Sequence, residues 1–170
     1  MGIIDPREQL RAKADVGYVN FYEEAIKASA EFRKEYDSRM NVVKSAEMPL
    51  ERSPDGLIKH IINEKMNTKE YCLDIYMQFL PGGKASGKHR HLSEEVFYVV
   101  EGSGYDLHWD VRFDCHDVME FEWDAEPRKF EWKAGDFVYI PPYVTHQHFN
   151  ADPSNEARII VCNSRIVKAM

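Results

Sequence analysis

The stretch Gly82–Gly102, "GGKASGKHRHLSEEVFYVVEG", contains the residues that decide the fold class. Two histidines, His89 and His91, are one residue apart, two glutamates follow, and the segment then becomes apolar. Burying histidine and carboxylate groups without partners is costly, and a metal ion would be such a partner. In an extended segment both imidazoles point to the same face and can share one ion, and parity adds Glu95 to that face rather than Glu94. Zinc, iron, manganese, cobalt, nickel and copper all accept imidazole, so the pair does not choose the metal.

The overall composition limits the possible classes of protein. The chain has 170 residues, enough for one domain with a core, and 44% of them are apolar. Its formal net charge is −7, and no lysine or arginine cluster stands out, so we expect neither nucleic-acid binding nor attraction to an anionic membrane. Neither a membrane-spanning apolar run nor a signal-peptide core is present, and the three cysteines are widely spaced, so we expect a cytoplasmic protein.

The sequence pattern changes near residue 57, from helical spacing of apolar residues to short strand-like segments. Residues 15–39 show apolar residues at three- and four-residue spacing, which predicts an amphipathic helix. We therefore expect a helical extension over residues 1–56 and a β-domain over residues 57–170. The apolar stripe of the helix is expected to pack on the β-domain of its own chain or of a second subunit. It consists of Tyr18, Phe21, Tyr22, Ala25, Ile26, Ser29, Phe32 and Tyr36.

Short strands separated by turns are expected throughout the second part. Residues 105–116, "YDLHWDVRFDCH", alternate almost strictly, which predicts one strand with its apolar residues buried and with His108 and His116 on the surface. The tripeptide "FEW" occurs at 121–123 and at 130–132, and we expect these two copies to form a hairpin with Pro127 near the turn. Many short strands with regular turns indicate a sandwich or a barrel. The other expected strands are 71–80, 94–101, 136–142, 145–150 and 157–163.

Two sequence motifs resemble those of the cupin superfamily. The first motif, G-x5-H-x-H-x3,4-E-x6-G, is matched by Gly83, His89, His91, Glu95 and Gly102, whereas Glu94 does not satisfy its spacing. The second motif, G-x5-P-x-G-x2-H-x3-N, is matched by Gly135, Pro141, His146 and Asn150. Tyr143 stands where the second motif has glycine, which affects the turn before His146. The resemblance covers about residues 57–167.

The resemblance implies a small antiparallel barrel, the double-stranded β-helix or jelly roll of cupins, that holds one divalent metal ion. Its ligands would be His89, His91, Glu95 and His146. Iron(II) is the expected metal, with manganese, zinc, nickel and cobalt as alternatives. His148 shares the face of His146, and it is either a packed histidine or a catalytic proton carrier, since histidine titrates near neutral pH. The residues expected to line a substrate pocket are Phe97, Tyr139, Tyr143 and Asn150.

Three classes of function remain open at this point. The segment around the second motif resembles gentisate dioxygenases and related ring- or diketone-cleaving cupins, although Glu95 departs from the three-histidine site of gentisate dioxygenases. This resemblance implies an iron(II) dioxygenase acting on a small aromatic or diketone-type substrate. The alternative is a non-oxidative lyase, decarboxylase or isomerase, and a third possibility is a ligand-binding module. Tyr98 and Val100 face outward beside the expected interior, so the N-terminal helix or a second subunit should cover them, and we also expect a homodimer or a larger homo-oligomer.

Overall fold

Residues 20–70 and 72–164 are described by a computed structural model, and the chain divides into two units between Arg39 and Met40. The first unit contains the helix α2, Phe21–Ser38, which begins at Asn20, whose side chain accepts a hydrogen bond from the Glu23 backbone N–H. The predicted helix is confirmed over this range, and its expected first turn, with Tyr18, lies outside the described residues. None of the helices in the described part of the chain has the length and apolarity needed to cross a membrane.

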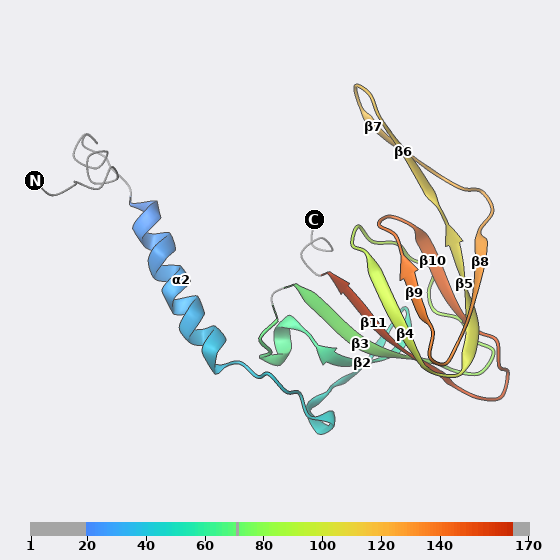
Figure 1. The fold of residues 1–170 in the computed structure, drawn as a ribbon, viewed down its shortest axis with the longest axis horizontal. Helices are drawn as coiled ribbons and strands as arrows, with labels where there is room; N and C mark the ends of the chain where they lie inside the picture. The colour runs from blue at the N-terminus through green and yellow to red at the C-terminus, as the bar shows by residue number, and fades with distance from the viewer. Residues whose placement is uncertain (1–19, 71, 165–170) are drawn as a thin grey trace, which may run out of the picture. The chain divides into compact units, whose positions relative to one another are not determined.

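The second unit is built from antiparallel strands, which Figure 1 shows wound into a barrel. Two short 3-10 helices, Ser45–Glu47 and Glu64–Met66, lie in its connections. The strands are β1 Leu50–Ser53, β2 Gly56–Ile62, β3 Leu73–Leu80, β4 Glu95–Glu101, β5 Ser103–Trp109, β6 Val111–Cys115, β7 Met119–Trp123, β8 Arg128–Lys133, β9 Phe137–Ile140, β10 Thr145–Asn150 and β11 Ala157–Ser164.

The strands form two main sheets whose inner faces share one core. One sheet has the order β1-β2-β3-β11-β4-β9, and the other has the order β10-β5-β8. Phe97 from β4 packs edge-on against Trp132 from β8, with ring centroids 6.1 Å apart, so the core joins the two sheets. The predicted all-β barrel is therefore confirmed. The fully or nearly buried apolar residues are Ile58, Tyr76, Leu80, Phe97, Val99, Trp132, Ile140, Val144, Ala157, Ile159 and Val161.

The barrel unit begins earlier in the chain than expected. Strand β1 pairs with β2 in the register Leu50↔Lys59, and the Met40 N–H donates to the Asn67 carbonyl at 2.8 Å. Residues 40–56 therefore contribute to the barrel unit, and its boundary lies at Arg39/Met40 rather than between residues 56 and 57.

The alternating segment 105–116 is not one strand, and over β5 its burial is the reverse of the prediction. It forms β5 and β6, and on β5 the buried residues are Gly104, Asp106 and His108. The alternating apolar residues of β5, such as Leu107, are only half-buried. The prediction of a surface position for His108 is wrong, because its strand turns its polar face toward the barrel interior, whereas His116 is exposed.

The two "FEW" copies do not pair with each other. Strand β7 pairs with β6, whereas β8 pairs with β5 in the barrel. The hairpin prediction is wrong because each copy pairs with a different strand: the first forms a two-stranded ribbon with β6, and the second extends the sheet of β10 and β5. Figure 1 shows β6 and β7 as a ribbon that extends from the barrel.

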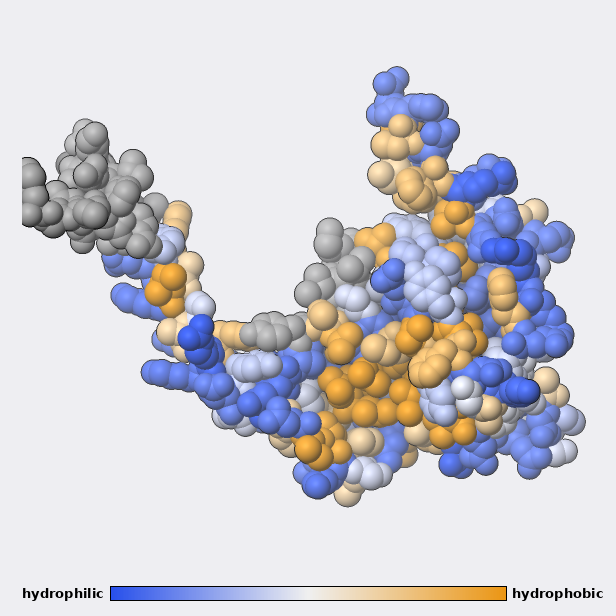
Figure 2. All heavy atoms as spheres, in the orientation of Figure 1, coloured by the Kyte–Doolittle hydropathy of each residue, from blue (hydrophilic) through white to orange (hydrophobic). Residues whose placement is uncertain are grey.

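The outer face of the six-stranded sheet carries apolar side chains, which Figure 2 shows gathered over this sheet. On β4, Glu95, Phe97 and Val99 point inward, and Tyr98 and Val100 point outward and are exposed, as the parity of the strand predicts. Phe137 from β9 lies beside them, with its ring centroid 4.8 Å from that of Tyr98.

Candidate metal centre

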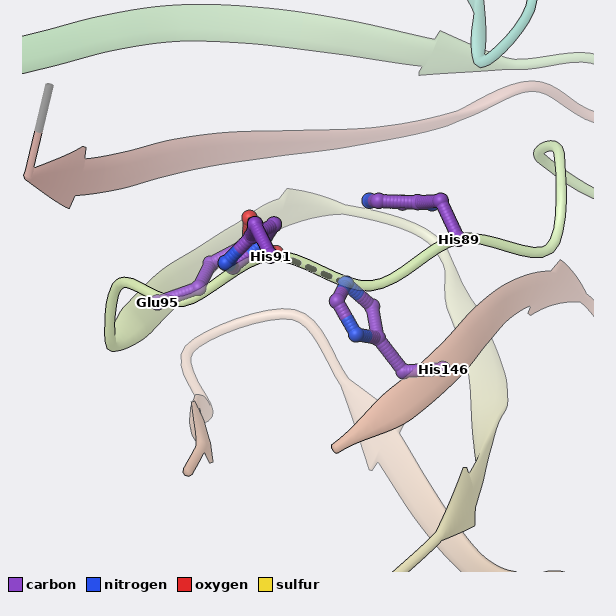
Figure 3. A group of neighbouring side chains, drawn as sticks. All are labelled: His89, His91, Glu95 and His146. Atoms are coloured by element: carbon purple, nitrogen blue, oxygen red, sulfur yellow. Dashed lines mark hydrogen bonds and ion pairs between the residues drawn. The ribbon is translucent and has the colours of Figure 1, made fainter. Parts of the chain in front are cut away.

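The four side chains of the first and second motifs come from three segments that meet inside the barrel (Figure 3). His89 and His91 lie on the extended segment before β4, Glu95 is the first residue of β4, and His146 lies on β10. Paired backbone hydrogen bonds between His89 and His146, at 3.0 and 2.8 Å, hold the first segment against β10. One ligand atom from each of the four residues lies within 4.8 Å of the others.

Each of the three histidines has its Nδ1 atom engaged by the backbone. The Nδ1 atoms of His89, His91 and His146 lie 3.0, 2.8 and 3.0 Å from the carbonyl oxygens of residues 87, 93 and 144, respectively. A carbonyl oxygen can only accept a hydrogen bond, so each Nδ1 carries the proton. The Nε2 atoms are therefore the ones free to bind a metal, and such partners fix the ring orientation of metal-binding histidines.

Two buried polar atoms at the centre of this cluster have no hydrogen-bond partner among the described residues. They are Oε1 of Glu95 and Nε2 of His146, and both residues are almost completely buried. Leaving such atoms unpaired costs about 1–3 kcal/mol each. A divalent cation would satisfy both, and imidazole with carboxylate suits several first-row metals. The residues therefore fit a metal ion.

The charges of the cluster are balanced within the barrel. Burial raises the pKa of Glu95, but its contact with Nε2 of His91 at 3.2 Å and the neighbouring imidazoles outweigh burial and lower that pKa to about 2. Burial lowers the pKa of His146 to about 3, so this imidazole stays neutral and able to bind a metal. The His89 side chain is 25% exposed and that of His146 is 0% exposed, so the cluster approaches solvent at His89.

His148 lies beside this cluster with its two ring nitrogens in different surroundings. Its Nδ1 is 2.9 Å from Oδ2 of Asp106, and its Nε2 is 3.6 Å from Oε1 of Glu95. Burial lowers the pKa of His148, but the carboxylates of Asp106 and Glu95 outweigh burial and raise it to about 9. Without a metal, His148 is therefore protonated at neutral pH, and a neighbouring divalent cation would lower its pKa again by Coulomb repulsion.

The four residues predicted to line a pocket lie in four different places. Phe97 is buried, with its ring centroid 5.1 Å from that of His148, so it forms a dry wall of the interior. Tyr143 lines a largely apolar groove of about 890 Å³ beside the β6–β7 ribbon, and its ring stacks on that of Phe121. Tyr139 is 53% exposed and its hydroxyl donates to Glu94.

Two of these placements do not fit the predicted pocket role. Tyr139 alternates with Val138 and Ile140, which point inward, so its own side chain points out of the barrel. The Asn150 amide donates to the carbonyls of Leu80 and Asn155, and its oxygen accepts from the backbone N–H of residue 152. Asn150 therefore fixes the connection between β10 and β11, and its polar atoms are used there.

Three interior residues near His148 were missed by sequence reasoning. Asp106, His108 and Trp132 are all buried, and the two former were placed on the surface by the apolar alternation of their segment. The second motif already indicated that these two residues face inward. The strand after Gly102 must pair with a neighbour, and if that neighbour carries His146 and His148 facing inward, polar residues opposite them also face inward.

Comparison with known proteins identifies the fold and the family. A cupin 2 conserved barrel domain protein from Salinispora arenicola has a TM-score of 0.52 at 17% identity, covering 74% of this chain and 89% of that one. A predicted oxalate decarboxylase from Thermotoga maritima has a TM-score of 0.51 at 18% identity, covering 73% and 98%. The fold is therefore that of a cupin. A family model described as auxin binding protein matches residues 38–169, and the chain belongs to this family.

A curated relative shares part of the sequence. The acireductone dioxygenase of Puccinia graminis f. sp. tritici is 34% identical over 82 residues. The match covers 48% of this chain and only 38% of that protein.

Proposed function

We propose that this protein is a metal-dependent cupin enzyme, and more specifically a mononuclear iron(II) dioxygenase acting on a small aromatic or diketone-type substrate. The observation that carries the proposal is the cluster of His89, His91, Glu95 and His146, with two buried atoms that a cation would satisfy. The partial relative named as a dioxygenase supports the oxygenase over other reactions.

A bound divalent ion supplies a Lewis acid and, when it is iron, a redox centre. The residues of the chain supply the surroundings. His148, held on one side by Asp106, presents Nε2 toward Glu95 and can exchange a proton with a substrate oxygen at the cluster. Phe97 packs against the His148 ring and excludes water from that side. Because a bound cation would lower the raised pKa of His148 again, this imidazole would be suited to exchange a proton near neutral pH.

The test is the metal content of protein purified without oxygen, followed by oxygen uptake with catechols, hydroxybenzoates and β-diketones. We expect about one iron per chain, in keeping with a single site, and substrate-dependent oxygen uptake. His91→Ala is the matched variant, because it removes one ligand, and it should abolish both signals.

The rival function is a lyase, decarboxylase or isomerase, which the same four ligands could serve. It predicts equal turnover in air and under argon, with zinc or manganese able to replace iron. Turnover without oxygen on a redox-inert metal would overturn the oxygenase and leave the metal-dependent enzyme standing. Binding of a metal and a ligand without any turnover would favour a binding module.

We also propose that the protein forms a homodimer or a larger homo-oligomer and that it is cytoplasmic. The outward-facing Val96, Tyr98 and Val100 of β4, with Phe137 of β9, support packing of this sheet against a second copy of the chain. Light scattering after size-exclusion chromatography tests this: Tyr98→Lys should yield a smaller species than wild type. A wild-type protein that is monomeric by light scattering would contradict the proposed self-association.

A further inference from the structure

Asp106 and His148 form a direct cross-strand pair inside the barrel. Strands β5 and β10 are in the register His148↔Asp106 and His146↔His108, so the four side chains lie on one inward face. His146 belongs to the metal cluster, so Asp106 stands one pair away from it. The carboxylate reaches His148 at its Nδ1 atom, the nitrogen turned away from the cluster.

The Asp106 carboxylate is held at both oxygens. Oδ2 lies 2.9 Å from Nδ1 of His148 and 3.3 Å from Nε2 of His108, and Oδ1 accepts a hydrogen bond from the Trp132 indole at 2.8 Å. Asp106 is 0% exposed. A buried carboxylate is costly unless it is paired and hydrogen-bonded, and here it is both. The arrangement therefore leaves the carboxylate little freedom to rotate.

The position of the Trp132 indole depends on a glycine opposite it. Gly104 pairs with Trp132 across β5 and β8. A Cβ atom at position 104 would lie 2.4 Å from the Trp132 ring and 2.0 Å from the Phe149 carbonyl oxygen, so no larger residue fits. The space left by this glycine lets the indole reach Asp106, and the ring also packs edge-on against Phe97, which in turn packs against His148.

We propose that Asp106 is a positioning residue that keeps the proton of His148 on Nδ1 and aims Nε2 at the metal cluster, with Trp132 fixing the carboxylate. An ionised carboxylate only accepts hydrogen bonds, so the imidazole nitrogen facing it must carry the proton. The value of this orientation rests on the proposed function, in which His148 acts on a substrate oxygen at the cluster. A similar carboxylate–histidine contact sets the ring tautomer in hydrolases that use a catalytic triad.

The test is the protonation site of His148 in zinc-loaded protein, which is diamagnetic, by two-bond ¹H–¹⁵N correlation spectra of histidine-labelled chain. The signal is assigned by its loss in His148→Ala. We expect Nδ1 to be protonated in wild type. In Asp106→Asn the amide oxygen would accept from Trp132, so the amide N–H would face His148, and Nδ1 should lose its proton while Nε2 keeps one. Asp110 is a more exposed carboxylate that directly follows the same strand, and Asp110→Asn should leave the His148 signal unchanged.

The outcomes separate this inference from the proposed function. Wild type that binds zinc but has an unprotonated Nδ1 on His148 overturns the inference, even if no Asp106 variant folds. Asp106→Asn that folds, binds zinc and keeps the Nδ1 proton overturns it as well. Wild type that binds no metal, yet shows the Nδ1 proton and its loss in Asp106→Asn, overturns the proposed function and leaves the Asp106–His148 orientation standing.

Discussion

Replacing Glu95 by glutamine keeps the size of the side chain and removes its charge. In the metal-free protein, burial raises the pKa of Glu95, but His91, His146 and His148 outweigh burial and lower it from 4.5 to about 2. This difference corresponds to about 3 kcal/mol of folding free energy at neutral pH. Because the folded pKa is the lower one, the stabilisation is complete above pH 4.5 and is lost as the pH falls toward 2.

The expected result is a loss of up to about 3 kcal/mol for Glu95→Gln at pH 7, which for a domain of this size lowers the melting temperature by roughly 10 °C. Urea unfolding in the presence of a chelator measures this loss of free energy. The difference in the free energy of unfolding between wild type and Glu95→Gln should become smaller as the pH falls from 5 to 2. In the metal-loaded protein, Glu95→Gln should weaken binding by more than the roughly 10–100-fold cost of losing an outer partner of a ligand.

Glu94→Gln is the matched control, because Glu94 is the adjacent carboxylate and is exposed, bonded only to the Tyr139 hydroxyl in the described contacts. It should keep the metal content and nearly the full stability of wild type. The reasoning is refuted if Glu94→Gln strips the metal while Glu95→Gln retains it. It is also refuted if the two variants unfold at the same urea concentration.

The remaining predictions concern other parts of the chain. His148→Ala should keep iron but slow turnover by about 10²-fold, a low-end loss for an acid–base group, as measured by oxygen uptake. Because the pKa of His148 is raised to about 9, metal-free wild type should lose stability between pH 6.5 and 9 in urea titrations, and His148→Ala should not show this loss. Tyr143 has a φ of 64°, so Tyr143→Gly should be about 1 kcal/mol more stable than Tyr143→Ala in urea, since both lose the ring stack and only alanine keeps the strain. A chain beginning at Met40 should fold and bind metal, because this unit holds all four ligands, and an unfolded or metal-free product would contradict it.

The grouping of His89, His91, Glu95 and His146 could be predicted from the sequence because most of it is local. His89, His91 and Glu95 lie within one short segment, so the spacing of the first motif predicts their meeting, although the chain bends at Leu92 and Ser93 before β4 begins at Glu95. His146 required the second motif, since nothing in local spacing brings β10 beside residue 89. The structure joins these segments by the backbone pairing of His89 with His146.

The strand pairings around the "FEW" copies could not be predicted in the same way. Pairing depends on which strand lies nearest in three dimensions, and a short repeated tripeptide carries no information on that. The chain bends at Ala125 and Glu126, just before Pro127, but this segment connects ribbon strand β7 to barrel strand β8 instead of closing a hairpin.

The reversed burial of β5 has a physical cause that also explains why the sequence did not predict the contact between Asp106 and His148. Alternation of apolar and polar residues tells which face of a strand is dry only when the interior is apolar. Here the interior opposite β5 holds His146 and His148, so the residues that face it must pair with imidazoles, and Asp106 and His108 do so. The apolar residues of β5 are consequently displaced to the other face, where Tyr105 stacks on Phe149 of β10 at 4.8 Å. For a polar residue on a strand beside the one that carries His146 and His148, the residue that it will face therefore predicts burial better than its own hydropathy does.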